Sequence, residues 1–235
     1  MISALYDSTL KLWNLETGEI LRTFQGHSGR VFAVALTLDG KQVISGSDDS
    51  TLKLWNLETG EILRTFQGHS RRVNAVALTP DGKQVISTSS DNTLKLWNLE
   101  TGEILRTFPG ENQRTFHGYN GTLFAVALTR DGKQVISASS DYTLKLWNLE
   151  TGEILRTFQG HSDEVKAVAL TADGKQVISA SNDNTLKLWN LETGEEIATF
   201  TGEAAFYCCA VAPDGVTIVA GERLGRVHFL RLENV

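Results

Sequence analysis

The sequence predicts an all-β fold built from repeated copies of one four-stranded antiparallel sheet. The first observation is a recurring segment, TLKLWNLETGEILRTF or its variant TLKLWNLETGEEIATF, which begins at Thr9, Thr51, Thr93, Thr143 and Thr185. The second is its period, because the five tryptophans follow one another at intervals of 42, 42, 50 and 42 residues. The third is that each period holds four short apolar runs separated by turn sequences. A period of this length indicates a repeat architecture.

Residues 24–66 show how one repeat is built. VFAVALT (31–37) is apolar at nearly every position, as in a strand buried on both faces. After the turn LDGK come a second strand, QVISGS (42–47), and a third, TLKLWN (51–56). EILRTF (61–66) is more polar and suits an outer edge. We name these strands a, b, c and d, and the connections between them are too short to hold helices.

One such sheet cannot bury two apolar faces by itself. Stacked copies can, since each sheet covers the next, and a ring of them leaves only short edges. Alanines in strand a, such as Ala33 and Ala35, suit a crowded inner position. We therefore expect a β-propeller of four-stranded antiparallel blades.

The strand count predicts six blade units, of which the first and last are incomplete. The first unit begins at strand b (ISAL) and the last ends after strand c. We expect one domain, residues 1–235, with units at about 1–24, 25–66, 67–108, 109–158, 159–200 and 201–235. Two alternatives stay open: five blades, with strand d near residues 20–24 completing the last blade and residues 1–14 displaced, or part of a seven-bladed ring.

The composition of the chain favours some classes of partner and some cellular compartments over others. The 235 residues carry a net charge of -6, and this mild acidity argues against nucleic acid as a partner. No stretch approaches the ~20 apolar residues of a membrane span, and MISALYDSTL lacks the charged leader of a signal peptide. Cys208 and Cys209 are adjacent, so on a strand they point to opposite faces and cannot form an ordinary disulfide. We expect a reducing, cytoplasmic location.

The order of motifs in each unit resembles the WD-repeat family. GH stands near the start of a unit, then come DG, S-x-D-x-T and Trp, and the resemblance covers essentially the whole chain. The near-identical copies resemble a bacterial member with recently amplified blades. One departure is uniform: the residue after Trp is Asn in all five copies, where the family usually has Asp. Asn can serve the same turn through its side chain.

The resemblance implies hydrogen-bonded networks of His, Ser, Asp and Trp inside the blades. Buried polar groups must be paired, and a satisfied network rigidifies its surroundings. The implied members are His27, Ser45, Asp49 and Trp55; His69, Ser87, Asp91 and Trp97; Ser137, Asp141 and Trp147; and His161, Ser179, Asp183 and Trp189.

Two units depart from this pattern. In the fourth, Tyr119 takes the His position after an insertion around PGENQRTF. In the last, all four positions are replaced, by Glu203, Ala220, Leu224 and Leu230. We therefore expect the last unit to rely on apolar packing alone.

A catalytic interpretation of Ser, His and Asp is less favoured than a structural one. It would have to hold in several identical copies, each with its Ser in mid-strand. His27, His69 and His161 belong to different blades and lie too far apart to share one metal ion. No phosphate-binding G-x-x-x-x-G-K occurs. We expect no catalytic residue, no metal and no cofactor, and therefore a protein that is not an enzyme.

Differences between the copies gather on one predicted face. Because strands alternate in direction, the d–a and b–c loops lie on one face, and the c–d turn NLETGE, identical in all five copies, lies on the other. Aromatic residues and Arg are the usual anchors of protein interfaces. Drift of loops after duplication is the alternative explanation. The candidate binding residues are Arg30, Phe32, Asp48, Arg72, Asn74, Ser90, Thr122, Phe124, Ser140, Tyr142, Glu164, Lys166, Asn182 and Tyr207.

The sequence thus predicts a non-enzymatic module that binds a protein or peptide, as WD-repeat proteins generally do. The run GRVHFLRLE resembles the endings of bacterial WD-repeat sensor regions, which implies a regulatory region of a signalling system. One alternative is an enzyme or sugar-binding propeller with a site at the channel mouth, using Asn74, Asp163, Glu164 and Lys166. Another is a scaffold without a specific ligand. Near-identical repeats and incomplete terminal blades also predict self-association.

Overall fold

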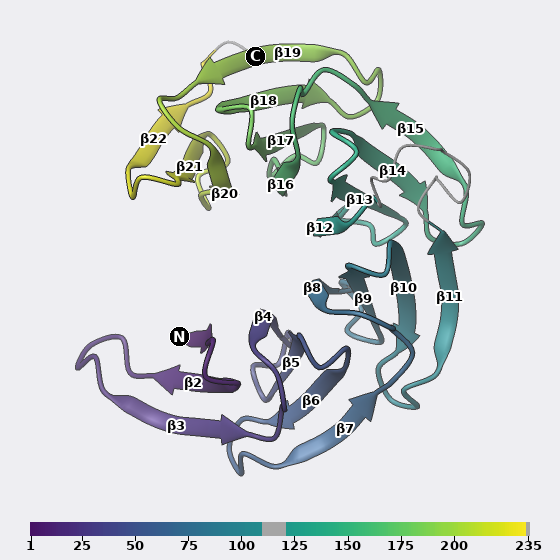
Figure 1. Cartoon of the computed structure of the whole chain (residues 1–235), viewed down its shortest axis with the longest axis vertical. Coiled ribbons are helices and arrows are strands. Elements are labelled where there is room, and N and C mark those ends of the chain that lie inside the picture. Colours follow the sequence, from purple (N-terminus) through teal and green to yellow (C-terminus); the bar gives the residue numbers. More distant parts are fainter. Residues whose placement is uncertain (110–120, 234–235) are drawn as a thin grey trace. The chain divides into compact units, whose positions relative to one another are not determined.

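The structure, a computed structural model, describes residues 1–109 and 121–233. The described residues form 22 β-strands arranged in six antiparallel sheets (Figure 1). The chain divides into two compact units, Met1–Gly110 and Glu111–Val235. We call them the N-terminal and C-terminal units, and each holds three sheets.

The N-terminal unit contains sheets 1 to 3, in which each strand pairs with its neighbour in the chain. Sheet 1 has three strands: β1 (Ile2–Ala4), β2 (Thr9–Trp13) and β3 (Ile20–Gln25). Sheet 2 has four: β4 (Val31–Leu36), β5 (Gln42–Ser47), β6 (Leu52–Asn56) and β7 (Ile62–Phe66). Sheet 3 has β8 (Val73–Leu78), β9 (Gln84–Ser89), β10 (Thr93–Asn98) and β11 (Ile104–Pro109).

The C-terminal unit contains sheets 4 to 6 and repeats the same meander. Sheet 4 has β12 (Leu123–Leu128), β13 (Gln134–Ser139), β14 (Leu144–Asn148) and β15 (Ile154–Phe158). Sheet 5 has β16 (Val165–Leu170), β17 (Gln176–Ser181), β18 (Thr185–Asn190) and β19 (Glu196–Thr201). Sheet 6 has three strands: β20 (Phe206–Val211), β21 (Thr217–Glu222) and β22 (Val227–Arg231).

The predicted strand pattern is confirmed, including the two incomplete sheets. Sheet 1 consists of strands b, c and d, and sheet 6 of strands a, b and c. The alternative in which strand d near residues 20–24 completes the last sheet is wrong, because β3 pairs with β2 from Thr9↔Gln25 to Trp13↔Ile20. The single domain and the closed six-bladed ring stay predictions.

The core of each unit lies between successive sheets. A Phe at the end of strand d packs edge-on against the Trp of the following sheet. The ring centroids are 5.9 Å apart for Phe24 and Trp55, and 6.0 Å apart for Phe158 and Trp189. These four rings are almost fully buried. The repeated Trp and Phe therefore join sheets 1, 2 and 3 within the N-terminal unit, and sheets 4 and 5 within the C-terminal unit.

The uniform Asn after Trp shapes the c–d turn. The Asn56 side-chain Oδ1 accepts the backbone N–H groups of Glu58 and Thr59 over 2.8 and 2.9 Å, and the other four copies make the same pair of bonds. Gly60 completes the turn at φ 82°, a conformation that glycine adopts without strain. Asn thus serves this turn as Asp would.

In the described part of the chain, no helix is long and apolar enough to cross a membrane.

Candidate interaction face and internal networks

Sheet 2 contains a continuous hydrogen-bonded network. His27 Nδ1 lies 2.8 Å from Asp49 Oδ2, and His27 Nε2 lies 2.7 Å from Ser45 Oγ. Trp55 Nε1 donates to the same Ser45 Oγ over 2.8 Å. A neutral His27 with its proton on Nδ1 satisfies all of these contacts, since Ser45 can donate to Nε2 while accepting from Trp55. The network therefore uses both roles of the Ser45 hydroxyl.

The same arrangement recurs in sheets 3 and 5. In sheet 3, His69 lies 2.8 Å from Asp91 and 2.7 Å from Ser87, and Trp97 donates to Ser87 over 2.8 Å. In sheet 5, the corresponding distances are 2.8 Å from His161 to Asp183, 2.6 Å from His161 to Ser179 and 2.8 Å from Trp189 to Ser179. The structure thus brings together the residues predicted for all three complete networks.

The charge states follow from these contacts. Burial alone would raise the pKa of the Asp49 carboxyl, but hydrogen bonds from His27 and Thr51 hold that pKa well below its ordinary value. The pKa of Asp91 is lowered in the same way by His69 and Thr93. Burial lowers the pKa of His161 from its ordinary 6.5, against the opposing influence of Asp183. An ionised Asp and a neutral His agree with the donor directions above.

In sheet 4 the network aspartate pairs with a lysine. Trp147 Nε1 donates to Ser137 Oγ over 2.9 Å, as in the other sheets. Lys145 Nζ, on a buried side chain, donates to Asp141 Oδ2 over 2.7 Å. In sheet 2 the equivalent Lys53 instead donates to Thr65 in strand d over 3.0 Å. Tyr119 and residues 110–116 of the insertion lie outside the described residues.

Sheet 6 does not rely on apolar packing alone, so that prediction is wrong. The side chain of Glu222 is fully buried, and its Oε1 lies 3.0 Å from His228 Nε2. The same oxygen accepts the backbone N–H of Glu203 over 3.0 Å. The rings of Phe200 and Phe206 flank His228, with centroids 5.3 and 5.4 Å away. Glu222 at the end of strand b thus lies beside His228 in strand c. Both residues can be assigned to these positions from the sequence.

The predicted loop face carries a row of cations and aromatic rings in the N-terminal unit. The guanidinium carbon of Arg72 lies 4.6 Å from the ring centroid of Phe32, and Phe32 meets Tyr6 edge-on at 5.7 Å. The guanidinium carbon of Arg30 lies 5.3 Å from the centroid of the Tyr6 ring. Tyr6 was missed from the sequence, although it precedes Asp7 as Asp48 precedes Asp49.

Polar contacts hold one end of this row. Arg72 Nε donates to Asn74 Oδ1 over 2.7 Å, and Asn74 Nδ2 donates to Ser90 Oγ over 3.1 Å. The backbone N–H of the exposed Asp48 donates to the carbonyl of Arg30 over 2.8 Å. Residues that vary between the copies therefore contact one another across sheets 1, 2 and 3. We call Tyr6, Arg30, Phe32, Arg72 and Asn74 the aromatic–arginine row.

The C-terminal unit holds a second, smaller cluster. Lys166 Nζ lies 3.6 Å from the ring centroid of Phe124 and forms an ion pair with Glu164. Asn182 Nδ2 donates to Glu164 Oε2 over 3.2 Å. Among the other candidates, the Ser140 N–H donates to the carbonyl of Thr122 over 2.9 Å, and Tyr142 and Tyr207 are exposed.

The polar residues named for the enzymatic alternative make internal contacts. The three network serines are buried, and each hydroxyl is bonded to both Trp and His. At the suggested channel-mouth site, Lys166 and Glu164 pair with each other, and Asp163 Oδ1 accepts the neighbouring N–H of Glu164. Within residues 1–109 and 121–233, no group of His, Cys, Asp and Glu could hold a metal ion.

Meandering sheets that stack through Trp and carry a Trp–Ser–His–Asp network define a class of protein built from β-propeller blades. The family model for the WD domain, G-beta repeat, matches residues 18–56, 60–98 and 110–148, and a model for the TEP-1 C-terminal beta-propeller matches residues 161–232. The chain belongs to the WD40-repeat β-propeller family.

One curated relative is an uncharacterized WD repeat-containing protein of Schizosaccharomyces pombe. It is 33% identical over 48 residues. The matched segment spans 20% of this chain and 12% of that protein.

Proposed function

We propose that this protein is a non-enzymatic scaffold that binds a protein or peptide through the aromatic–arginine row. WD40 domains commonly act as protein-interaction scaffolds. The observation that carries the proposal is the exposure of Tyr6 between Arg30 and Phe32, with 72% of its surface accessible. An isolated exposed aromatic needs no explanation, but a contiguous row of aromatic and arginine side chains is typical of interface anchors.

The row is also preorganised for binding. Arg72 is held by both the Phe32 ring and Asn74, so ordering its side chain in a complex costs little further entropy. The five residues come from three successive sheets, whose stacking fixes their spacing. The opposite face carries the c–d turns, which are identical in all five copies, and it varies mainly at the residue before Asp-Gly in the a–b turn.

The run GRVHFLRLE supports a role as the regulatory region of a bacterial signalling system, in which a bound partner would be the sensed signal. Cys208 and Cys209 are both free thiols, which agrees with a reducing, cytoplasmic location.

A charge reversal in the row tests the proposal. The Arg72→Glu variant should lose the proteins that the wild-type chain captures from a lysate of its host. Lys83→Glu is the matched control, because Lys83 is exposed on the a–b turn of the same sheet and belongs to the opposite face. Equal capture by all three chains, measured by quantitative mass spectrometry, would assign binding elsewhere.

A further inference from the structure

Sheet 6 ends in an open strand edge. Within the described residues, β22 pairs with β21 and with no other strand. The N–H of Glu222 donates to the carbonyl of Arg226 over 2.9 Å, and the N–H of Leu232 donates to the carbonyl of Val216 over 2.8 Å. Hydrogen-bonding direction alternates along an antiparallel strand, so the backbone groups of Val227, Phe229 and Arg231 point away from β21. This edge can accept another strand.

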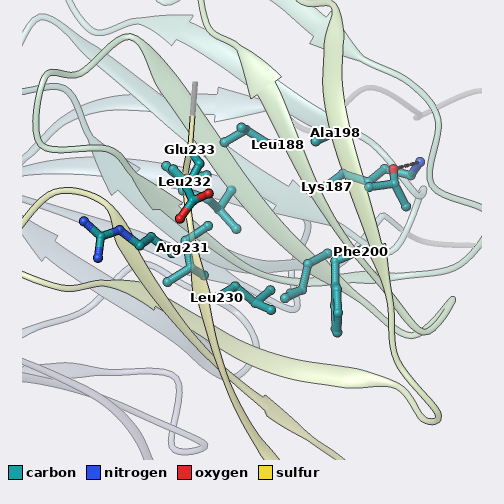
Figure 2. Close-up of a pocket in the computed structure, with 12 residues that line it drawn as sticks. Lys187, Leu188, Ala198, Phe200, Leu230, Arg231, Leu232 and Glu233 are labelled. Carbon is teal, nitrogen blue, oxygen red and sulfur yellow. Dashed lines mark hydrogen bonds between the residues drawn. The ribbon is translucent and has the colours of Figure 1, made fainter. Parts of the chain in front are cut away.

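An apolar groove of about 300 Å³ runs beside this edge in the C-terminal unit (Figure 2). Leu188, Ala198 and Phe200 line it from sheet 5, and Ile218, Leu230 and Leu232 line it from sheet 6. The register of β21 with β22 places Leu230 where the preceding sheet has Trp189. A leucine leaves open the space that a fully buried indole fills in the complete sheets.

A second substitution widens the groove. In strand d of sheets 1, 2 and 4, an arginine donates to a carbonyl in the c–d turn of the following sheet, at 2.7 to 3.0 Å. Sheet 5 has Ala198 at this position, and sheet 6, which follows it, has no c–d turn within the described residues. Sheets 5 and 6 therefore differ from the other sheets on both sides of the groove.

The complete sheets show which strand would fit the edge. In sheet 2, strand d pairs with strand c through Leu52↔Phe66, Lys53↔Thr65 and Trp55↔Ile62. In the same register on β22, Phe would lie opposite Val227, Thr opposite His228, and Ile opposite Leu230. Directly paired side chains share a face of the sheet, so the Ile would enter the groove beside Leu230.

Charge adds to this fit. A glutamate precedes every strand d, at Glu19, Glu61, Glu103, Glu153 and Glu195. In sheet 2 its backbone carbonyl accepts the N–H of Asn56 over 3.0 Å. The equivalent of Asn56 in sheet 6 is the exposed Arg231. A glutamate at the start of an added strand would therefore lie beside an arginine, a pairing that none of the complete sheets has.

We propose that β22 binds an extended peptide segment of a partner as a fourth, antiparallel strand. Its pattern is acidic residue, large apolar residue, two unrestricted residues, Thr and aromatic residue, as in Glu-Ile-Leu-Arg-Thr-Phe. Main-chain hydrogen bonds supply affinity in this mode of recognition, and side-chain pockets supply specificity. The site shares no residue with the aromatic–arginine row and does not depend on the function proposed for that row.

The first experiment titrates the full chain into a fluorescein-labelled peptide, GEILRTFQG, and follows anisotropy. Binding should be saturable below about 1 mM, and a scrambled peptide should not bind. Phe229→Pro removes one outward N–H and should weaken binding by about tenfold or more. Proline is tolerated on edge strands at such positions, and unchanged thermal unfolding would verify the fold. The matched control, Phe229→Val, keeps the N–H and should bind as the wild type does.

A charge swap tests the register. Arg231→Glu should weaken binding of the glutamate peptide by about fivefold. The same variant should bind a peptide with Lys in place of that Glu better than the wild-type chain does. If Arg231→Glu affects both peptides equally, the proposed register is wrong.

Amide hydrogen exchange separates the proposal from other occupants of the edge. The amides of Val227, Phe229 and Arg231 should exchange quickly in the free chain and slowly with peptide. Slow exchange in a monomeric free chain would show that the chain covers its own edge, and would overturn the proposal. Dimers that Phe229→Pro dissociates would assign the edge to a second copy and equally overturn it, as would failure of the peptide to bind at about 1 mM.

Discussion

Trp55 donates its indole N–H to Ser45 Oγ over 2.8 Å, and Ser45 is at the same time bonded to His27 over 2.7 Å. All three side chains are buried, so one hydroxyl satisfies two groups that have no water available. The pair links strands b and c of sheet 2, while His27 extends the chain of bonds to the loop before strand a. This relationship explains why the repeat retains a small hydroxyl residue in the middle of an apolar strand.

Removing this hydroxyl should therefore be costly. Ser45→Ala leaves the indole N–H of Trp55 and Nε2 of His27 without partners, and we expect a loss of about 2 kcal/mol in the free energy of unfolding. Urea titration followed by tryptophan fluorescence measures the loss. Ser28→Ala is the control, because the Ser28 side chain is exposed and only its backbone N–H bonds Asp49. That variant should stay within about 0.5 kcal/mol of wild type, and equal effects of the two changes would contradict the structural role.

Acid should destabilise the protein through these networks. The pKa values of Asp49, Asp91 and Asp183 are lowered in the folded state, so their contribution is present above the unfolded value and is lost as the pH falls. The pKa of His161 is also lowered, so below its ordinary 6.5 the unfolded chain takes up this proton more readily than the folded one. Both effects have the same sign.

We therefore expect stability to be nearly constant above neutral pH and to fall progressively below pH 6.5. Urea titrations at a series of pH values measure this dependence. Asp183→Asn removes one titrating carboxyl and should flatten the lower part of the curve, although it lowers stability at neutral pH. Rising stability between pH 6.5 and 4 would show that the folded-state pKa values are not lowered.

The lysine that replaces histidine as the partner of Asp141 can be tested against its own repeat. Lys145→Met keeps the apolar stem but leaves the partly buried Asp141 without its cation, and we expect a loss of about 1–2 kcal/mol. Lys53→Met, at the same position in sheet 2, removes only a bond to Thr65 and should cost about 0.5 kcal/mol. Chemical denaturation of both variants measures the two losses. Equal losses would mean that the Lys145 ion pair stabilises the protein no more than the hydrogen bond of Lys53 does.

The buried acid of sheet 6 gives a further prediction. Glu222→Ala removes the acceptor of the Glu203 N–H and the carboxylate that lies 3.0 Å from His228 Nε2, and we expect a loss of about 2 kcal/mol in the free energy of unfolding. Glu222→Gln keeps an acceptor for the N–H and should lose about half as much. Protease susceptibility of residues 200–233 provides a local measurement beside global unfolding. A stability of Glu222→Ala equal to that of wild type would return sheet 6 to the apolar packing expected from its sequence.

Repetition made most of the fold predictable. Each strand is bounded by the same turn in several copies, so several copies indicate each strand boundary. The network residues were found through a resemblance that names them by position. Glu222 and His228 were missed because their substitutions occur in a single copy, where no second copy shows what each replaced residue does.

Contacts between the side chains of successive sheets could not be predicted from the sequence. Phe32 and Arg72 belong to successive sheets, and their stacking depends on how those sheets pack. Lys145 has the same immediate sequence neighbours as Lys53, yet Lys145 donates to Asp141 whereas Lys53 donates to Thr65. Tyr6 belongs to a sheet without strand a, so the alignment of copies gave it no place among the variable residues.

The b–c turn of sheet 4 holds a bulky residue in a left-handed backbone conformation. Tyr142 has φ 70°, a left-handed conformation that strains a bulky residue, whereas Asn92 and Asn184 hold the same position in sheets 3 and 5. Tyr142→Asn should therefore raise the free energy of unfolding by about 0.5–1 kcal/mol, and Asn92→Tyr should lower it by a similar amount. Denaturation of the two reciprocal variants measures both effects. If Tyr142→Asn instead destabilises the chain, or if Asn92→Tyr has no effect, the left-handed conformation does not strain the tyrosine.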